Sequence, residues 1–297
     1  MKQGLDRQGV HQTPCSADLR RAIDEHELTL HYQAKFDCVD ERTVVGVEAL
    51  IRWNHPRMGE LPPGCILPLA KDADLLTEVT DFTITEAIRQ HASWRDQGID
   101  LPIAVNLAPG LISDARFPDR LLNSLSEFDV PASRLTLDLK ETDRVGDRGL
   151  CIDALEQLRG AGVGLALDDF GAGLSSITEI YELPLTEIKI HRELILDAAR
   201  LTQARLVLRS IVRLAHALSI NVTAEGVEDR SDLLCAMAAG CDWVQGTLLS
   251  APTLPFDVAD LLRRDGIRLE DKRFLDHVSD RRAAAHLSAQ IASKRRI

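Results

Sequence analysis

The stretch GLALDDFGAGLSSITEIYELPLTEIKI (residues 164–190) decides the fold class, because two strand-like runs in it flank a helical segment. The runs are GLALDDF at 164–170 and EIKI at 187–190. Strands that alternate with helices predict a parallel sheet with helical crossovers. In residues 193–219, apolar side chains recur at spacings of three, four and seven, which predicts an amphipathic helix; they are Leu194, Ala198, Leu201, Leu208, Ile211, Ala215 and Leu218.

The same alternation extends along the chain in both directions. Six further β-rich runs stand at 28–36, 43–53, 103–107, 135–140, 221–227 and 243–249. Eight strands joined by helices within about 250 residues predict an α/β protein with a closed (β/α)8, TIM-like barrel. The first two runs are joined only by DCVDER (37–42), which is too short for a helical crossover. We therefore expect an antiparallel first strand.

Composition excludes several classes of protein. The chain has 297 residues and a formal net charge of −11, which argues against binding to duplex DNA or RNA. It has no apolar run of roughly 18 residues and no apolar core at its N-terminus, so we expect neither a membrane span nor a secretory signal. The six cysteines lack CxxC spacing, which favours reduced thiols in a cytoplasmic protein without structural zinc.

The domain organisation is simple. We expect a disordered lead-in over 1–15, a barrel domain over 16–265 and a basic helical tail over 266–297. Ser16 is the expected cap of a short helix that ends near Glu25. A solvated tail is favoured over a tail that docks on a partner or a membrane. We expect no fused sensor domain, because only about 16 residues precede the barrel and about 30 follow it.

Polar residues interrupt the apolar strands near their C-terminal ends, and parallel strands bring these ends to one rim of a barrel. They are Glu48, Asn106, Asp138, Asp168, Asp169, Lys189, Glu225 and Gln245. Five clustered carboxylates need cations, and oxygen ligands suit Mg²⁺ or Mn²⁺. Taken alone, Asp168 and Asp169 are equally compatible with helix capping and with chemistry, and Glu48 or Glu225 is compatible with a buried ion pair. Their coincidence at seven strand ends favours a metal-dependent site.

Such a site has a defined chemistry. The adjacent Asp168 and Asp169 can bridge two metals, which would neutralise a phosphodiester and generate a hydroxide nucleophile. Lys189 would hold the attacking water or stabilise developing negative charge.

The motifs HYQAKF, VEALIRWNHP, VNLA, LDLKET, DDFGAGLSSI, LPLTEIKIH, TAEGVE and GCDWVQGTL, in this order over residues 17–265, resemble the EAL-domain family of cyclic di-GMP phosphodiesterases. The resemblance implies hydrolysis of cyclic di-GMP to linear pGpG with Mg²⁺ or Mn²⁺, two ions per site. It implies metal ligands at Glu48, Asn106, Asp138, Asp168, Asp169 and Glu225. It implies catalytic roles for Lys189, Glu48 and Glu141, and nucleotide contacts at Gln33, Leu50, Arg52 and Gln245.

The loop after the paired aspartates has its own implications. Gly171 and Gly173 allow tight turns, and Ser175 and Ser176 can begin the next helix. In the family this loop and its helix contribute to dimerisation, so the resemblance implies a homodimer.

Three residues depart from the family pattern. Asp138 replaces a glutamate and is shorter by one methylene, so it reaches a metal only through water or a backbone shift, or suits a more tolerant ion such as Mn²⁺. His191 replaces an acid. Three interpretations are open: a hydrogen bond at the rim, weaker organisation of Lys189, Gln245 or the second metal, or ligation of a transition metal by His191 itself. Lys140 either adds positive charge beside the ligands or extends to solvent. Ala34 and Thr247 are lesser changes.

These departures keep other function classes open. We favour a working phosphodiesterase with reduced activity over a receptor that binds cyclic di-GMP without cleaving it. A protein-interaction module that does not bind the nucleotide ranks third, because Arg52 and Gln33 are retained.

Overall fold

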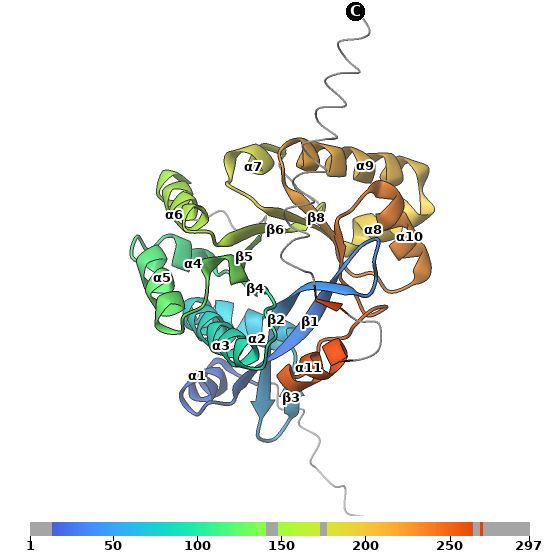
Figure 1. Cartoon of the computed structure of the whole chain (residues 1–297). Coiled ribbons are helices and arrows are strands. Elements are labelled where there is room, and N and C mark those ends of the chain that lie inside the picture. Colours follow the sequence, from blue (N-terminus) through green and yellow to red (C-terminus); the bar gives the residue numbers. More distant parts are fainter. Residues whose placement is uncertain (1–13, 141–147, 173–176, 264–267, 270–297) are drawn as a thin grey trace, which may run out of the picture.

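The computed structural model describes residues 14–140, 148–172, 177–263 and 268–269. Their central feature is a closed ring of strands (Figure 1). In order around the ring it comprises β1 (Leu28–Asp37), β9 (Trp243–Val244), β8 (Asn221–Ala224), β7 (Glu187–Ile190), β6 (Gly164–Phe170), β5 (Leu135–Lys140), β4 (Ile103–Asn106) and β2 (Thr43–His55), and β2 pairs with β1 to close it. Strand β1 is antiparallel to both neighbours, and the other pairs are parallel. The predicted barrel with its antiparallel first strand is confirmed.

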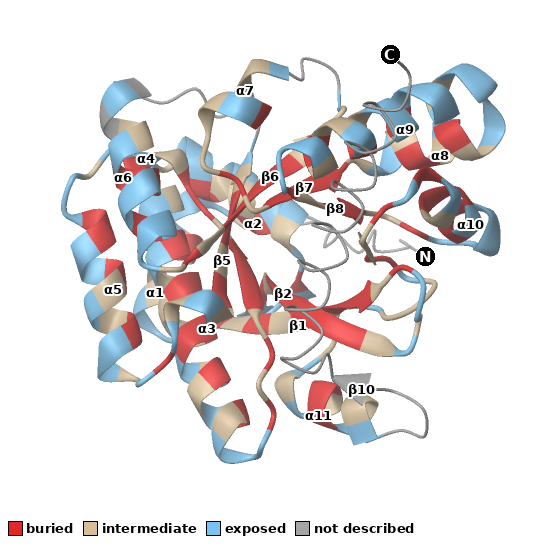
Figure 2. Cartoon of the chain, turned by 45° about the horizontal axis from the view of Figure 1, so that its top comes forward, coloured by how far each residue is buried: buried red, intermediate tan, exposed pale blue. Residues whose placement is uncertain are grey.

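Helices lie around the ring, and most of them carry buried residues beside exposed ones, as the colours of Figure 2 show. They are α1 (Ser16–Asp24), α2 (Pro63–Asp72), α3 (Leu76–Asp96), α4 (Pro109–Ile112), α5 (Phe117–Glu127), η1 (Ala132–Arg134), α6 (Arg148–Gly160), α7 (Ile177–Glu182), α8 (Arg192–Arg200), α9 (Thr202–Ala217), α10 (Arg230–Ala239) and α11 (Pro255–Arg263). In α3, the buried side chains Ile84, Ile88, His91 and Trp94 recur every three or four residues, so one stripe faces the core.

The helix predicted over 193–219 is wrong in one respect, because two helices occupy it. Leu201 has an extended backbone (φ −112°, ψ 127°) and separates α8 from α9. Arg205 stabilises the break, since its side chain donates to the carbonyl oxygens of Ala198 (3.0 Å) and Ala199 (3.2 Å) at the end of α8. The apolar spacing continues in phase across the break, so the pattern did not reveal it.

Smaller differences concern the ends of elements. Helix α1 begins after Cys15 rather than after a capping Ser16, and the Asp18 carboxylate accepts the Cys15 N–H at 3.0 Å. Strands β8 and β9 are shorter than predicted, which leaves Glu225 and Gln245 just beyond their ends. The sequence did not predict β3 (Gly59–Leu61), which pairs with β2, or β10 (Arg268–Leu269).

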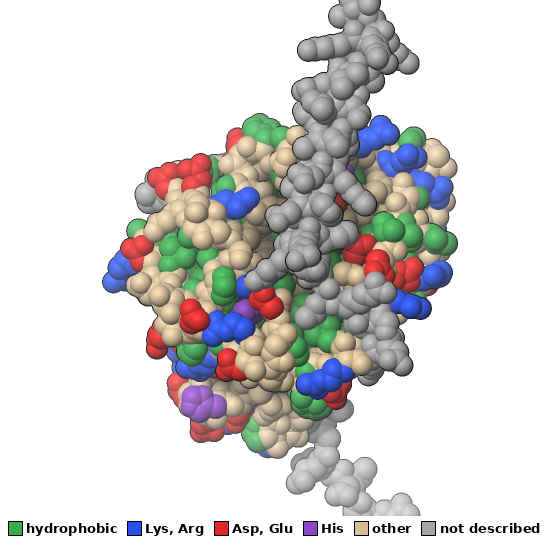
Figure 3. All heavy atoms as spheres, in the orientation of Figure 1, with side chains coloured by type: hydrophobic (Ala, Val, Ile, Leu, Met, Phe, Trp, Pro, Cys, Tyr) green, Lys and Arg blue, Asp and Glu red, His purple; other side chains and the backbone are tan. Residues whose placement is uncertain are grey.

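The proposed divisions of the chain are only partly covered by the structure. Strand β10 lies in the segment expected as a tail and pairs with β2 at Thr43 and Val44. The rest of that tail, and residues 1–13 of the lead-in, lie outside the described residues. Among the described residues, no helix combines the length and the apolar character needed to span a membrane. Figure 3 shows acidic and basic side chains interspersed over the visible face.

Candidate active site

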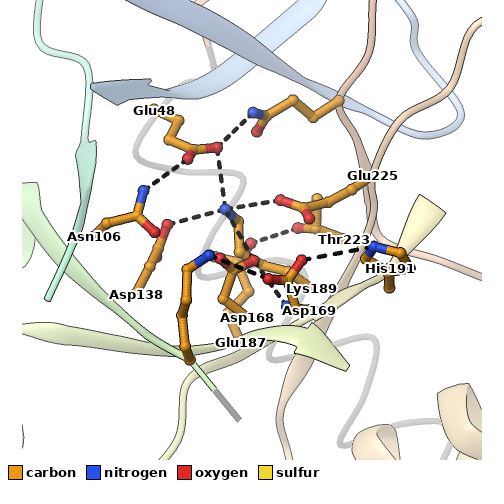
Figure 4. A network of polar contacts seen from close by, with 12 residues as sticks. Glu48, Asn106, Asp138, Asp168, Asp169, Glu187, Lys189, His191, Thr223 and Glu225 are labelled. Carbon is orange, nitrogen blue, oxygen red and sulfur yellow. Dashed lines mark hydrogen bonds and ion pairs between the residues drawn. The ribbon is translucent and has the colours of Figure 1, made fainter. Parts of the chain in front are cut away.

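The polar residues predicted at the strand ends meet at one rim of the barrel (Figure 4). Glu48 comes from the middle of the long β2, next to the end of its pairing with β4. The others come from the C-terminal part of their strands or from the residue directly after: Asn106 from β4, Asp138 from β5, Asp168 and Asp169 from β6, Lys189 from β7, Glu225 after β8 and Gln245 after β9. Parallel strands place these ends side by side, so residues far apart in the sequence form one cluster.

Lys189 lies at the centre of the cluster and is 1% exposed. Its Nζ lies 2.8 Å from Glu225 Oε1, 2.9 Å from Asp138 Oδ2 and 3.1 Å from Glu48 Oε2. A fourth carboxylate oxygen, Asp168 Oδ1, is 3.7 Å away. One buried ammonium group therefore balances part of the charge of four carboxylates.

Glu48 is held by amide groups on either side of this ammonium. Its Oε1 accepts from Asn106 Nδ2 (3.1 Å), and its Oε2 accepts from Gln245 Nε2 (2.7 Å). The chain of contacts continues to the neighbouring strand, because Gln245 Nε2 also lies 3.2 Å from Gln33 Oε1. Gln33 in turn donates to the Ser250 carbonyl oxygen at 3.0 Å. The orientation of Glu48 is fixed before any ligand binds.

Asp138 is completely buried, and only one of its oxygens has a partner. Oδ2 accepts from Lys189, whereas Oδ1 has no hydrogen bond among the described residues. Burial is the main reason that the pKa of Asp138 is raised to about 7, and nearby Glu48 and Asp168 add to the effect while Lys189 opposes it. A buried acceptor without a donor is costly, so this oxygen is suited to receive a ligand.

The pKa values of the other titratable groups in the cluster shift in different directions. Burial raises the pKa of Asp168 and of Glu225, despite the opposing effect of Lys189. Burial acts in the same direction on Glu48, but Lys189 and the amide donors outweigh it and lower the pKa of that carboxyl. For Lys189, burial is outweighed by the surrounding carboxylates, Asp138 first, and the pKa is raised. Lys189 is therefore an ammonium at neutral pH.

Three carboxylates form a group that can hold a metal ion. One oxygen from each of Asp168, Asp169 and Glu225 lies within 4.8 Å of the others. Neighbouring strand residues normally point to opposite faces. Here Asp169 has a φ of 58°, and the β6–β7 register shifts between Leu167 and Phe170, so both aspartates reach the same rim. The other predicted ligands lie outside this group: Glu48 and Asp138 contact Lys189, as Glu225 also does, and Asn106 donates to Glu48.

Two of the three departures lie directly beside Asp169. Lys140 Nζ is 3.3 Å from Asp169 Oδ2, so this lysine adds positive charge next to the group that can bind metal. His191 Nε2 is 3.9 Å from Asp169 Oδ1, and its Nδ1 accepts the N–H of Glu193 at 3.3 Å as the cap of α8. His191 therefore fits the interpretation of a hydrogen-bonded residue at the rim.

A hollow of about 340 Å³ lies over the site. Its lining includes Gln33, Leu50, Asp168, Glu225 and Gln245, together with Pro63 and Leu67. Three predicted nucleotide contacts, Gln33, Leu50 and Gln245, thus lie beside the carboxylates.

Arg52, the fourth predicted nucleotide contact, has a different setting. It is buried, donates to the carbonyl oxygen of Ile51 at 2.9 Å, and lies 3.7 Å from Glu60. His31 Nε2 approaches the same Glu60 carboxylate at 3.1 Å.

Some predicted residues cannot be placed, and others were not predicted. Glu141, Gly173, Ser175 and Ser176 lie outside the described residues. Gly171 has a φ of 97°, in agreement with the turn expected there. The sequence reading missed Glu60 and a buried group below the rim, Lys35, Glu187 and Thr223. The two-residue period of the strands, counted back from Lys189 and Glu225, would have found Glu187 and Thr223.

The fold and site define a (β/α)8 barrel with a carboxylate-rich centre, and comparison with known proteins gives its family. The model of the EAL domain matches residues 16–252. The chain therefore belongs to the EAL domain family. It is 37% identical over 236 residues to the bifunctional diguanylate cyclase/cyclic di-GMP phosphodiesterase MucR of Pseudomonas aeruginosa, and the match covers 79% of this chain and 34% of MucR.

Two further comparisons extend this result. The cyclic di-GMP phosphodiesterase RocR of P. aeruginosa is 31% identical over 252 residues, covering 84% of this chain and 64% of RocR. A solved structure described as the PaMucR phosphodiesterase in complex with c-di-GMP has a TM-score of 0.75 and 36% identity, and the match covers 82% of this chain and 98% of that one. The chain spans about a third of MucR and less than two thirds of RocR, so these relatives contain further segments.

Proposed function

We propose that this protein is a metal-dependent phosphodiesterase that hydrolyses cyclic di-GMP to linear pGpG. The observation that carries the proposal is the buried Lys189 ammonium, bound by Glu48, Asp138 and Glu225 at the rim of the barrel. Next to it lies the group of carboxylates that can bind metal, under a hollow of about 340 Å³. The names of MucR, RocR and the MucR complex with c-di-GMP support the same substrate.

The residues fit Mg²⁺ or Mn²⁺, two per site. The ligands would be Glu48, Asn106, Asp138, Asp168, Asp169 and Glu225, and their donor atoms are all oxygens, as hard divalent cations require. The unpartnered Oδ1 of Asp138 is a buried acceptor that lacks a donor among the described residues. When bound, the ions would supply Lewis acidity toward the phosphodiester and lower the pKa of water.

The chain's own residues supply orientation and charge. Lys189 donates hydrogen bonds into the centre of the site, where it can hold the attacking water and stabilise the charge that develops on phosphate oxygens. Glu48, fixed by Asn106 and Gln245, can accept the proton of that water. Glu141 is the third catalytic residue of the proposal. Gln33, Leu50, Arg52 and Gln245 would contact the nucleotide.

Two observations bear on the rate. Asp138 is bound to Lys189 through one oxygen, and Lys140 engages Asp169, so both need to rearrange when cations enter. The proposal is therefore an enzyme of reduced activity that works best with Mn²⁺. The contact between Lys140 and Asp169 also favours a second candidate, a receptor that binds cyclic di-GMP without cleaving it. A homodimer and a cytoplasmic location remain part of the proposal.

The test is chromatographic analysis of products formed from cyclic di-GMP in parallel Mg²⁺ and Mn²⁺ series, with chelator and Lys189→Met as controls. Linear pGpG that disappears in both controls is the expected result. Binding of cyclic di-GMP without product at high protein concentration would establish the receptor instead. Neither binding nor product would leave only a protein-interaction role.

A further inference from the structure

A second layer of polar side chains lies inside the barrel, directly below the active site. Lys35 Nζ lies 2.7 Å from both carboxylate oxygens of Glu187, and Thr223 Oγ1 donates to Glu187 Oε1. The ammonium of Lys35 also stands 4.5 Å from the centre of the Trp243 ring. Glu187 and Lys35 are 3% and 7% exposed, so the ion pair is buried. TIM barrels usually fill such layers with branched apolar residues.

Lys35, Glu187 and Thr223 each stand two residues along the chain from a member of the site, on the same strand or just beyond its end. Glu187 precedes Lys189 on β7, Thr223 precedes Glu225, and Lys35 follows Gln33 on the antiparallel β1. Residues two apart on a strand share a face and are about 6.6 Å apart along it. Charges in the lower layer therefore act on the site from below.

The strand that carries Lys35 is irregular at that residue. The β1–β2 register shifts between Lys35 and Phe36, and such a bulge redirects neighbouring side chains. The charge of Glu187 also reaches the site. It adds to the raised pKa of Asp138, although burial, Glu48 and Asp168 contribute more.

We propose that Lys35 and Glu187 are a positioning pair for the active site: Lys35 neutralises Glu187, so that Lys189 and the divalent cations stay with the upper carboxylates. Without Lys35, Glu187 becomes a buried anion whose nearest cation on its own strand is Lys189. The flexible lysine side chain then turns down toward Glu187 and leaves the upper carboxylates more negative. Without Glu187, Lys35 becomes an unpaired cation below the site.

The signs of these effects distinguish positioning from simple support of the fold. We expect Lys35→Met to lower kcat about tenfold and yet tighten Mn²⁺ binding to the metal-free protein by at least about fivefold. Glu187→Gln should weaken Mn²⁺ binding by at least about fivefold. The double variant Lys35→Met/Glu187→Gln removes both charges and should return Mn²⁺ affinity to within about twofold of the original chain. A pair that only supports the fold would weaken Mn²⁺ binding in all three.

The measurement is isothermal titration of Mn²⁺ into chelator-stripped full-length protein, with kcat and KM for cyclic di-GMP measured in parallel. Lys71→Met, which removes an exposed lysine from α2, and Lys35→Arg, which keeps the charge, are the controls. If Lys35→Met does not fold, Glu187→Gln carries the test, because unchanged Mn²⁺ affinity there overturns the inference. Equal losses of affinity in both single variants would also overturn it.

This inference rests on the proposed function, and the two fail in different ways. If the original chain neither binds Mn²⁺ nor cleaves cyclic di-GMP, the proposed function is wrong. If the original chain does both, but the two single variants shift Mn²⁺ affinity in the same direction, the proposed function stands and the positioning pair is wrong.

Discussion

Replacing Lys189 by methionine removes the one ammonium group that the described residues place among three buried carboxylates and the partly buried Glu225. Its Nζ lies within 3.7 Å of an oxygen from each of Glu48, Asp138, Asp168 and Glu225. Loss of one partner of a buried ion pair typically costs about 3–5 kcal/mol. In a domain of this size that corresponds to about 6–20 °C in Tm. We expect the lower half of this range, because the carboxyls with raised pKa can take up protons.

The same substitution should make stability depend on metal. Divalent cations then replace the missing ammonium group, whereas in the original chain they compete with it for the same oxygens. We expect Mn²⁺ to bind about tenfold more tightly to Lys189→Met, which adds about 1.4 kcal/mol, or about 3–6 °C, to the Mn²⁺-induced rise in Tm. Product formation from cyclic di-GMP should cease.

The assay is thermal unfolding of both proteins in chelator and in a Mn²⁺ series at pH 7.5, with the exposed Lys71→Met as the matched control. The expected pattern is a lower Tm in chelator and a larger Mn²⁺ increment for Lys189→Met alone. An equal Mn²⁺ increment in the original chain and in Lys189→Met would refute the reasoning, because Lys189 and the metals would then not share ligands.

Three further predictions concern individual side chains. If the short side chain limits metal binding, Asp138→Glu should raise kcat in limiting Mg²⁺ about tenfold, because one well-placed ligand contributes about 1.4 kcal/mol. Turnover that stays unchanged across a Mg²⁺ series would exclude this cause. Because the pKa of Asp138 is raised to about 7, its carboxyl is protonated below that pH in the metal-free protein. Mn²⁺ affinity should therefore rise between pH 6 and 8, and Mn²⁺ binding at pH 6 should release a proton. Titrations in buffers of different ionisation enthalpy measure that proton, and Asp138→Asn should release fewer. Glu60→Gln should bind cyclic di-GMP about threefold more tightly in chelator, because Arg52 loses a competing anion; an affinity equal to that of the exposed Glu156→Gln control would contradict it.

The same pKa shift has a consequence for stability. The folded-state pKa of Asp138, about 7, lies above the ordinary value of 3.8, so the folded state holds this proton more tightly than the unfolded state does. The stabilisation is fully present below about pH 4 and is lost as the pH rises through 7. In the metal-free protein, Asp138→Asn should therefore lower the dependence of Tm on pH between 4 and 7.

The features that could be predicted from the sequence are those with a local signal. A single acid or amide in an otherwise apolar strand, as at Asn106 or Asp138, identifies both the strand and its functional end. The alternation of strands and helices also predicted the barrel, because eight such strands joined by helical crossovers within about 250 residues have few other arrangements. The short DCVDER connection was enough to predict the direction of β1.

Features that depend on contacts between distant residues could not be predicted in this way. Lys35 and Glu187 are separated by 152 positions, and either residue alone is compatible with a solvated surface. The pairing of Arg52 with Glu60 depends on β3, whose three residues carry no clear strand period. The break at Leu201 leaves the apolar spacing in phase, so only the tertiary packing of α8 and α9 distinguishes two helices from one.

Strand β2 continues well past β4 on one side: it runs for 13 residues, whereas its pairing with β4 ends at Ala49. Leu50 and Arg52 therefore stand on an overhanging continuation of the strand that carries Glu48, and β1 braces it opposite His31 and Thr29. Leu50 and Arg52, proposed as nucleotide contacts, and Glu48, proposed as a catalytic carboxylate, thus share one strand instead of lying on separate loops. Such an arrangement tolerates substitution but not a change in length, because one inserted residue between Glu48 and Arg52 would turn Arg52 to the opposite face of the ribbon.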